Sequence, residues 1–378
     1  MKNYGLSTVS EFLENYIVYR NLEPADQSLP GLSEIALKID LPKGMTPRKT
    51  QLAYAQVVAY LLREAQRQRG VKGSIRNLVF IGDTRMLDGT AFINLCQAGG
   101  WQGAAFIGSE NKKPASFQLE ELPGGEKIYL ANRWSALTDF NQFCQAQGIP
   151  GDDTTALVID LDKTTLGARG RNAHTIDQAR VDAVQHTVAD LLGKSFDLAL
   201  FKSAYDLFNQ VEFHPFTADN QDYLAYICLV IGSGLEDTQR LSQQVRGGHM
   251  HSFEEFITQV DGRKKDLPEN LAAIHAEIYH LARRGDPTPF KAFRRNEYRL
   301  TIARMGYLPH DSPVETLLEQ EILITQEVSQ AALSWKKRGA LLFGLSDKPD
   351  EATFPTPEQS ARGYVPLHRT ATHVVGSD

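Results

Sequence analysis

Two carboxylates two residues apart follow an apolar segment in the middle of the chain. Residues 156–159 are apolar, Asp160 and Asp162 come next, and the hydroxyls of Thr164 and Thr165 follow. Residues two apart on a strand point to the same side, so both carboxylates can address one space as the chain leaves the strand. Two anions that close repel each other unless a cation or a proton relieves them. Carboxylate oxygens favour a hard cation such as Mg²⁺.

A second apolar segment also ends in paired acids. Residues 78–81 are apolar, Gly82 and Asp83 follow, and Asp88 comes five residues after Asp83. We expect the glycine to let the backbone turn tightly where the strand ends. A helical pattern at residues 90–98 and a further apolar segment come next, so the acids stand at a strand-to-helix connection.

These segments resemble the motifs of the haloacid dehalogenase-like (HAD) phosphohydrolases. The strand that ends in DxDxT, with Asp160 and Asp162, resembles the first motif of that family. The strand followed by GDxxxxD, with Asp83 and Asp88, resembles the fourth motif. The first motif is specific, whereas the fourth is weak by itself and gains weight from its context.

The two remaining motifs are less distinctive. Leu341–Leu345 followed by Ser346 and Asp-Lys-Pro is similar to the second motif. A third-motif lysine should precede the fourth motif by a helix, and Lys49 lies there, with Lys43 as a nearby substitute. We expect Lys49 in the first turn of a helix that begins at Thr46-Pro47, because threonine is a favoured N-cap and proline a favoured first residue.

The motif order along the chain is then three, four, one, two, which is a rotation of the family's order. We infer a circularly permuted core with its termini between the second and third motifs, since domain ends commonly lie close together. An unpermuted alternative places the third motif at Lys336 or Lys337 and the fourth at Asp347 and Asp350. It leaves Asp83 unexplained and allows too few residues for the intervening helix and strand.

The resemblance implies a role for each acid. Asp160 would attack phosphorus to form an aspartyl-phosphate, which divides one hard hydrolysis into two easier steps. Asp162 would protonate the leaving group and then deprotonate the attacking water. Mg²⁺ would be held by Asp160, Asp83 and the main-chain carbonyl of Asp162, with Asp88 supporting that shell.

The same resemblance implies roles for two further side chains. Ser346 would donate a hydrogen bond to a phosphate oxygen, and Lys49 would neutralise the charge of phosphate and nucleophile. A lysine in the first turn opposes the helix dipole, which indicates a functional reason for its position. Lys163 stands where the family usually has glycine, which is a departure from the family's pattern.

Periodicity divides the chain into two regions. Strand patterns alternate with helical patterns in residues 1–170 and 336–378, which predicts an α/β core with a mostly parallel sheet. Residues 171–335 are mostly helical. We therefore predict a Rossmann-like HAD core with a large helical cap insertion. A cap of this kind normally selects small substrates, which favours a phosphorylated metabolite, possibly a sugar phosphate.

Composition excludes several other classes. The net charge of −6 argues against a nucleic-acid partner. Three cysteines without metal-like spacing fit a reducing compartment. The chain has no signal-peptide apolar block and no apolar segment long enough for a membrane span. We therefore expect a cytoplasmic protein without membrane or nucleic-acid partners; the sequence does not indicate an oligomeric state.

Two other functions remain open at this stage. The same aspartate would serve a phosphotransferase or a phosphonate hydrolase of the superfamily. A HAD scaffold can also act as a binding protein without catalysis, although a complete set of acids argues against that role.

Overall fold

The chain divides into two compact units. The computed structural model describes residues 1–42 and 44–377, so Lys43 lies outside the described residues. The first, which we call the sheet unit, comprises Met1–Asp177 and the segment from Thr301 onward, and the second, the helical unit, is Gln178–Leu300.

The sheet unit is built on a seven-stranded sheet in which every neighbouring pair is parallel except β5 with β6. An α/β fold with a mostly parallel sheet is thus confirmed. Its two central strands are buried on both faces, which explains why they are continuous apolar runs in the sequence. In spatial order the strands are β2 (Ile17–Val18), β9 (Leu341–Leu345), β7 (Thr155–Asp160), β3 (Asn77–Gly82), β4 (Gln102–Gly108), β6 (Lys127–Ala131) and β5 (Phe117–Glu121).

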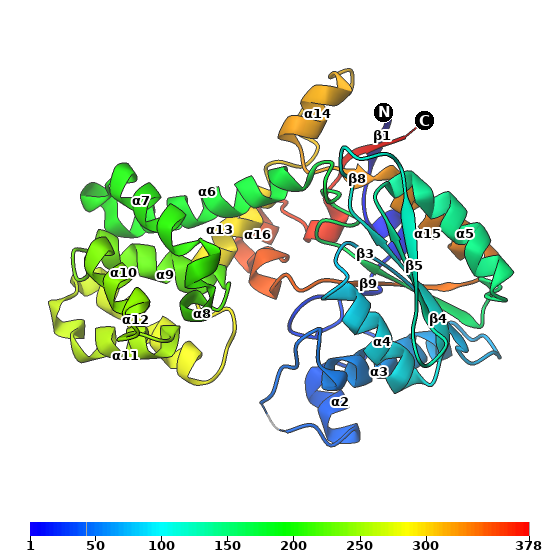
Figure 1. Cartoon of the computed structure of the whole chain (residues 1–378), viewed down its shortest axis with the longest axis horizontal. Coiled ribbons are helices and arrows are strands. Elements are labelled where there is room, and N and C mark those ends of the chain that lie inside the picture. The colour runs from blue at the N-terminus through cyan, green and yellow to red at the C-terminus, as the bar shows by residue number, and fades with distance from the viewer. Residues whose placement is uncertain (43, 378) are drawn as a thin grey trace. The chain divides into compact units, whose positions relative to one another are not determined.

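Helices cover both faces of this sheet (Figure 1). On one face α3 (Leu52–Gln68) packs against α4 (Asp88–Gly99), and their apolar sides form one core with the central strands. On the other face α15 (Gln326–Arg338) packs against α5 (Leu137–Ala146) and the short α1 (Ser10–Leu13). The predicted helix at residues 90–98 corresponds to α4.

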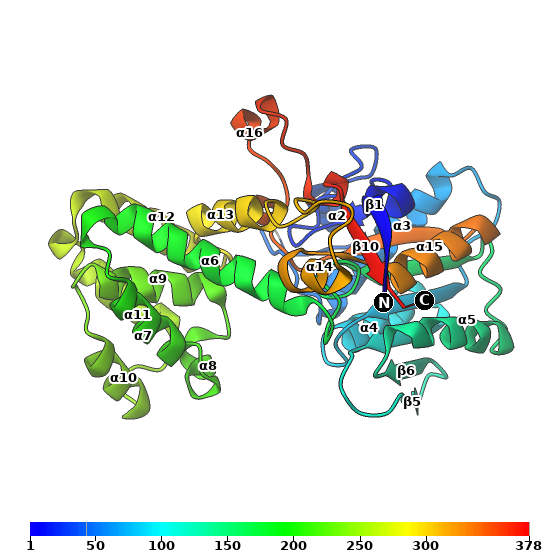
Figure 2. The ribbon, with the colours of Figure 1, turned by 90° about the horizontal axis from the view of Figure 1, so that it is seen from above.

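A second, three-stranded sheet joins the two ends of the chain. Strand β1 (Lys2–Ser7) pairs antiparallel with β10 (Thr372–Gly376), and β8 (Ile324–Thr325) pairs parallel with β10. Lys2 lies opposite Gly376, and Figure 2 shows the two termini side by side. Adjacent ends are the physical condition under which a domain tolerates a rotated chain order.

Residues 301–335 were predicted as part of the helical insertion, but they lie in the sheet unit. The helical pattern of residues 314–335 is not one helix. It contains α14 (Val314–Gln320), then β8, which joins the small sheet, and then α15, which packs on β9. The helix is interrupted because residues 322–325 are a buried run of apolar and β-branched side chains, which suit a strand. Sequence periodicity alone did not show which unit these elements pack on.

The N-terminal segment also differs from expectation. The amphipathic pattern of residues 9–17 is typical of one helix, but within it only the four residues of α1 are helical, and Ile17 begins β2. Strands β1, β5 and β6 were not predicted. Strand β5 is largely exposed at the edge of the sheet, so its residues lack the apolar pattern that marks a buried strand.

The helical unit has its own apolar core. Helix α9 supplies the centre, since nearly all of its residues are buried. Because the helix is apolar all round, it must be enclosed by the others. The helices of this region are α6 (Ala173–Leu192), which begins in the sheet unit, α7 (Leu198–Phe208), α8 (His214–Thr217), α9 (Gln221–Gly232), α10 (Thr238–Arg246), α11 (Phe253–Gly262), α12 (Glu269–Arg283) and α13 (Lys291–Ile302).

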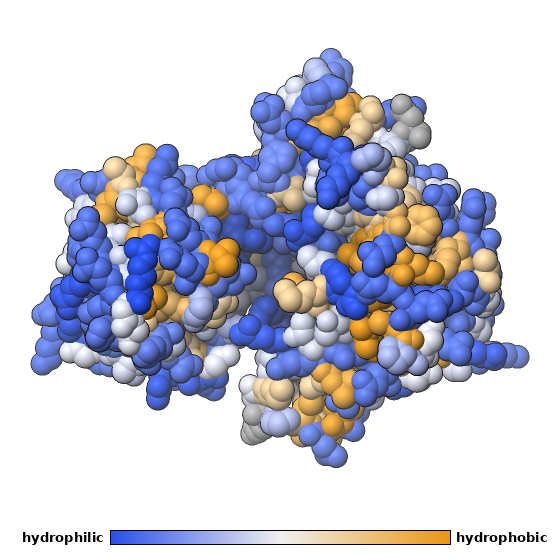
Figure 3. Space-filling view, in the orientation of Figure 1, coloured by the Kyte–Doolittle hydropathy of each residue, from blue (hydrophilic) through white to orange (hydrophobic). Residues whose placement is uncertain are grey.

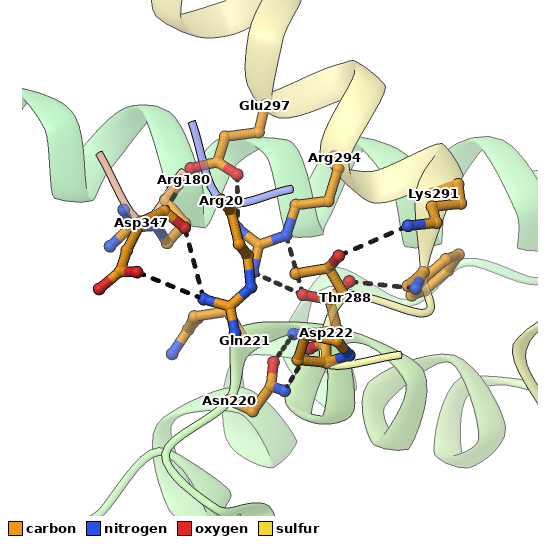
Figure 4. A network of polar contacts seen from close by, with 12 residues as sticks. Arg20, Arg180, Asn220, Gln221, Asp222, Thr288, Lys291, Arg294, Glu297 and Asp347 are labelled. Carbon is orange, nitrogen blue, oxygen red and sulfur yellow. Dashed lines mark hydrogen bonds and ion pairs between the residues drawn. The ribbon is translucent and has the colours of Figure 1, made fainter. Parts of the chain in front are cut away.

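A buried network of charges links the helices of this unit (Figure 4). Asp222 accepts hydrogen bonds from the Phe290 backbone N–H at 3.0 Å and from Arg294 Nε at 2.8 Å. Arg294 also contacts Glu297 at 2.6 Å, and Glu297 pairs with Arg180 at 3.2 Å. The network joins α9, α13 and α6, so each buried charge has a partner, as low dielectric requires.

The surfaces of the two units are mainly hydrophilic on the face shown in Figure 3. Apolar side chains gather over the sheet unit on the side where Figure 1 shows β5, and Phe117 and Leu119 of that strand are exposed. Within the described residues, no helix has both the length and the apolar character needed to traverse a bilayer.

A buried histidine ties the C-terminal segment to the N-terminal one. His368 accepts from or donates to the Tyr19 hydroxyl through Nδ1 at 3.1 Å, and both side chains are buried. The ring of Phe354 packs edge-on against Tyr19. Burial lowers the pKa of His368 to about 4 from its ordinary 6.5, and the neighbouring Arg369 adds to this effect.

The lowered pKa predicts a loss of stability in acid. The unfolded chain takes up a proton at His368 near pH 6.5 and the folded chain only near pH 4, so the stabilisation is complete above pH 6.5 and is lost as the pH falls toward 4. We expect His368 alone to lower the free energy of unfolding by about 2 kcal/mol between pH 7 and pH 5. Urea unfolding of the wild type and of His368→Gln at both pH values measures this. An equal pH-dependent loss in the two proteins would contradict the assignment.

Candidate active site

Three buried carboxylates meet at the carboxyl ends of two adjacent strands. Asp160 is the last residue of β7, Asp83 follows the end of β3, and Asp88 opens α4. The strands are paired in register, with Ile81 opposite Ile159. One oxygen from each of the three carboxylates lies within 4.8 Å of the others. The predicted first and fourth motifs are thus brought together, although 77 residues separate Asp83 from Asp160.

Lys49 enters this cluster from the loop before α3. Its Nζ lies 2.6 Å from Asp160 Oδ1 and 2.6 Å from Asp88 Oδ1, and only 4% of its side chain is exposed. The structure therefore places Lys49 against the acid expected to be the nucleophile. A charge-assisted contact to each of two carboxylates fixes both of them with respect to the ammonium.

The local structure around Lys49 was predicted wrongly. Helix α3 begins at Leu52 rather than at Pro47, so Lys49 is not in a first helical turn and the argument from the helix dipole does not apply. The side chain of Gln51 accepts the Arg48 backbone N–H at 2.8 Å, and this closes a turn ahead of the helix. The loop gives Lys49 the freedom to point inward that a helical position would restrict.

Asp88 is held on both of its oxygens. Oδ1 contacts Lys49, while Oδ2 accepts the backbone N–H groups of Asp83 and Thr84, each at 2.9 Å. Gly82 was expected to serve a tight turn. It is required instead for space, because a Cβ there would lie 2.5 Å from the Asp88 carboxyl carbon. Asp88 thus orients the loop that carries Asp83.

The turn after Asp160 is tied back to the strand end. The Thr165 hydroxyl donates to the Asp160 carbonyl at 2.8 Å. Lys163 has a φ of +63°, a conformation in which glycine is favoured and a side chain costs roughly 1–2 kcal/mol. The Lys163 ammonium pairs with Asp177 at 2.7 Å.

Two of the three carboxylates, those of Asp160 and Asp83, have raised pKa values, because the nearby cations do not fully offset the cost of burying their charge. Burial raises the pKa of Asp160 well above its ordinary value, against the influence of Lys49, and the acids at 88 and 83 raise it further. Burial raises the pKa of Asp83 to about 7, with Asp88 adding to the rise. A divalent cation would relieve both effects, and three carboxylates suit a hard, oxygen-preferring cation such as Mg²⁺.

The other pair in the cluster is stably ionised. Burial opposes the charge of Asp88, but Lys49 and the Thr84 N–H outweigh it and lower the pKa of this carboxyl group. Burial also opposes the charge of Lys49, yet Asp160 and Asp88 raise its pKa well above the ordinary value. Lys49 and Asp88 therefore form an ion pair, and Asp160 shares the same ammonium.

Sequence reasoning missed one cation at this site. Arg169, in the loop that follows the first motif, donates from Nε to Asp83 Oδ2. A single arginine in a loop carries no pattern. Its position nine residues after Asp160 was the only available signal.

The side chain of Asp162 lies outside the three-acid cluster. It is partly exposed, and its Oδ1 is 3.7 Å from the Nζ of the buried Lys348. The role of the Asp162 main-chain carbonyl as a metal ligand stays a prediction. A carboxylate beside the cluster, with access to solvent, suits a group that exchanges protons.

Ser346 lies directly after β9, the strand on the other side of β7. Leu345 pairs with Asp160, so Ser346 is at the same edge of the sheet as the acids. The serine is buried, and its hydroxyl accepts the Lys348 backbone N–H at 3.1 Å. The expected second motif is therefore next to the first.

The residues of the unpermuted alternative do not belong to the three-acid cluster. Lys336 contacts Glu14 at 2.7 Å. Asp347 Oδ1 lies 3.9 Å from Arg20, and Asp347 also contributes to the raised pKa of Lys49. Asp350 is not part of the acid cluster, and burial raises its pKa to about 6. The geometry favours the permuted assignment.

Comparison of the chain with models of protein families, with curated proteins and with solved structures returned no match. The function of this site is therefore inferred from its residues and their geometry.

The buried ion pairs predict a strong coupling between Lys49 and Asp160. Lys49→Met should lower the free energy of unfolding by about 3 kcal/mol, because it leaves buried carboxylates without their cation. Adding Asp160→Asn should restore part of that loss, since one of those carboxylates is then neutral. Urea unfolding of the two single variants and the double variant, in EDTA, measures the coupling. Additive effects would show that the two side chains do not interact.

Proposed function

We propose that this protein is a divalent-cation-dependent phosphoric monoester hydrolase that uses Asp160 as its nucleophile. One observation carries the proposal. Asp160 lies at the end of a central strand, with Lys49 at 2.6 Å and with Asp83 and Asp88 within 4.8 Å. Three separate segments that resemble the first, third and fourth motifs of a HAD phosphatase thus converge at one place, which supports the proposal.

The chemistry follows from the properties of these side chains. An oxygen of Asp160 attacks phosphorus, the bond from phosphorus to the leaving oxygen breaks, and Asp162 donates a proton to that oxygen. Water then attacks the aspartyl-phosphate and gives its proton to Asp162. Phosphate and a free Asp160 carboxylate result.

The remaining groups offset charge and hold the phosphate. A bound Mg²⁺ would reduce the repulsion between carboxylate and phosphate, and it would favour the ionised forms of Asp83 and Asp160, whose pKa values burial raises. Lys49 fixes the Asp160 carboxylate through Oδ1. Ser346, at the same sheet edge, would donate to a phosphate oxygen. The proposed substrate class is a small phosphorylated metabolite such as a sugar phosphate.

Turnover of p-nitrophenyl phosphate with Mg²⁺ tests the proposal. We expect the wild type to hydrolyse it and Asp160→Asn to lose at least about a thousandfold in kcat, because the amide cannot form the covalent intermediate. Asp177→Asn is the matched control, since it removes a carboxylate that pairs with Lys163 outside the acid cluster. Equal rates in wild type and Asp160→Asn across varied phosphate esters would favour a binding protein.

The same assay separates hydrolysis from phosphoryl transfer. With glycerol added as an acceptor, a hydrolase releases phosphate and nitrophenolate in equal amounts. A phosphotransferase releases less phosphate than nitrophenolate.

The cation requirement tests the permuted assignment. Asp83→Asn should raise the Mg²⁺ concentration needed for half-maximal activity by about tenfold or more, because it removes a charged ligand. Asp350→Asn should leave it unchanged, since Asp350 lies outside the acid cluster. Magnesium titrations of both variants decide between the assignments. The reverse result, with Asp350→Asn disruptive and Asp83→Asn silent, would support the unpermuted alternative.

A further inference from the structure

One carboxylate of the acid cluster is already paired with a cation that can leave. Arg169 donates a hydrogen bond from Nε to Asp83 Oδ2, while Lys49 pairs with Asp88 and Asp160. The Asp83 side chain is only 7% exposed, but 37% of the Arg169 side chain is exposed. The guanidinium therefore reaches the acid from the solvent side of the site.

The backbone beneath Arg169 is held independently of its side chain. Its N–H donates to the Lys163 carbonyl at 2.7 Å, and its carbonyl accepts from the Glu110 N–H at 3.0 Å and from Trp134 Nε1 at 3.2 Å. Gly170 comes next with a φ of +78°, and a Cβ there would lie 1.9 Å from the Glu110 carbonyl oxygen. The guanidinium can thus move while the loop remains in place.

A second arginine of the same loop shows the contrast. Arg171 has 3% of its side chain exposed and pairs with both Glu110 and Glu327 at 2.8 Å. Two partly buried acids hold its guanidinium from both sides, which indicates a structural role. Arg169 pairs with Asp83 through a side chain that is partly exposed to solvent. A cation that takes the place of the guanidinium offsets the charge of the buried Asp83, so this ion pair can be exchanged.

We propose that Arg169 is an exchangeable counter-ion, which neutralises Asp83 until a divalent cation displaces it and which thereby sets the cation affinity of the site. The inference rests on the cation in the proposed function. A carboxylate oxygen that accepts a guanidinium hydrogen bond has to give it up, or share it, when it ligates a hard cation. Once displaced from Asp83, the guanidinium is available to attract an anionic substrate.

Direct binding of Mn²⁺, measured by electron paramagnetic resonance without substrate, tests this role. We expect Arg169→Gln to lower the Kd by about tenfold, because the cation no longer has to replace a charged hydrogen bond. Arg169→Lys should fall between the two proteins, since it keeps the charge but not the shape of the donor. Asp83→Asn should weaken binding and so identifies the site. An unchanged or raised Kd in Arg169→Gln would overturn the proposal.

Arg85→Gln is the matched control. Arg85 has 38% of its side chain exposed, lies in the loop between Asp83 and Asp88, and pairs with Glu120 rather than with the cluster. A tenfold lower Kd in this variant as well would assign the effect to net charge and overturn the proposal. Absence of Mn²⁺ binding in both the wild type and Arg169→Gln would also do so.

Failure of the inference and failure of the proposed function give different results. Tighter binding in Arg169→Gln together with no phosphatase turnover in the wild type would leave the counter-ion role in place and remove the hydrolase. Turnover in the wild type with unchanged Mn²⁺ affinity in Arg169→Gln would remove the counter-ion role and leave the hydrolase in place.

Discussion

The ammonium of Lys49, buried between Asp88 and Asp160, is the interaction on which the site depends. Three carboxylates enclosed at a sheet edge repel one another, and burial adds to the cost of their charges. Lys49 offsets that cost for two of them at once. It can do so only because the loop before α3 turns its side chain inward, while the apolar face of α3 is anchored against α4 and the sheet.

The parallel sheet supplies the rest of the geometry. The carboxyl ends of β9, β7 and β3 lie side by side at one edge, so Ser346, Asp160 and Asp83 are neighbours in space. This convergence depends on which strands are adjacent and not on the order in which the chain makes them. The pairing of β1 with β10 brings these two strands side by side. The proposed rotation of the motif order is compatible with this arrangement, because domains with adjacent ends tolerate a permuted chain order.

The sequence predicted what depends on local pattern and missed what depends on packing partners. Buried strands followed by acids were found at Asp160 and Asp83, because full burial demands an apolar run and its end is visible. Lys49 was found from motif order, but its loop was mistaken for a helix start. Arg169 was missed because an arginine in a loop has no periodicity. The helical unit was predicted to extend to residue 335, because the pattern of residues 301–335 does not show against which unit their apolar side chains pack.

The energetics indicate that the cluster is retained for a reason other than stability. A buried polar constellation contributes less to folding than well-packed apolar side chains of the same volume. Here Asp160 and Asp83 have pKa values raised by burial, and the turn after Asp160 places Lys163 in a strained conformation. Perturbed acids, a buried lysine and backbone strain gather at functional sites, where each is part of the chemistry. Asp88 also orders the loop by accepting the backbone N–H groups of Asp83 and Thr84, so the case for a function rests on Asp160 and Asp83. The proposed reaction, in which a nucleophile, a cation and a phosphate meet at one point, would require both.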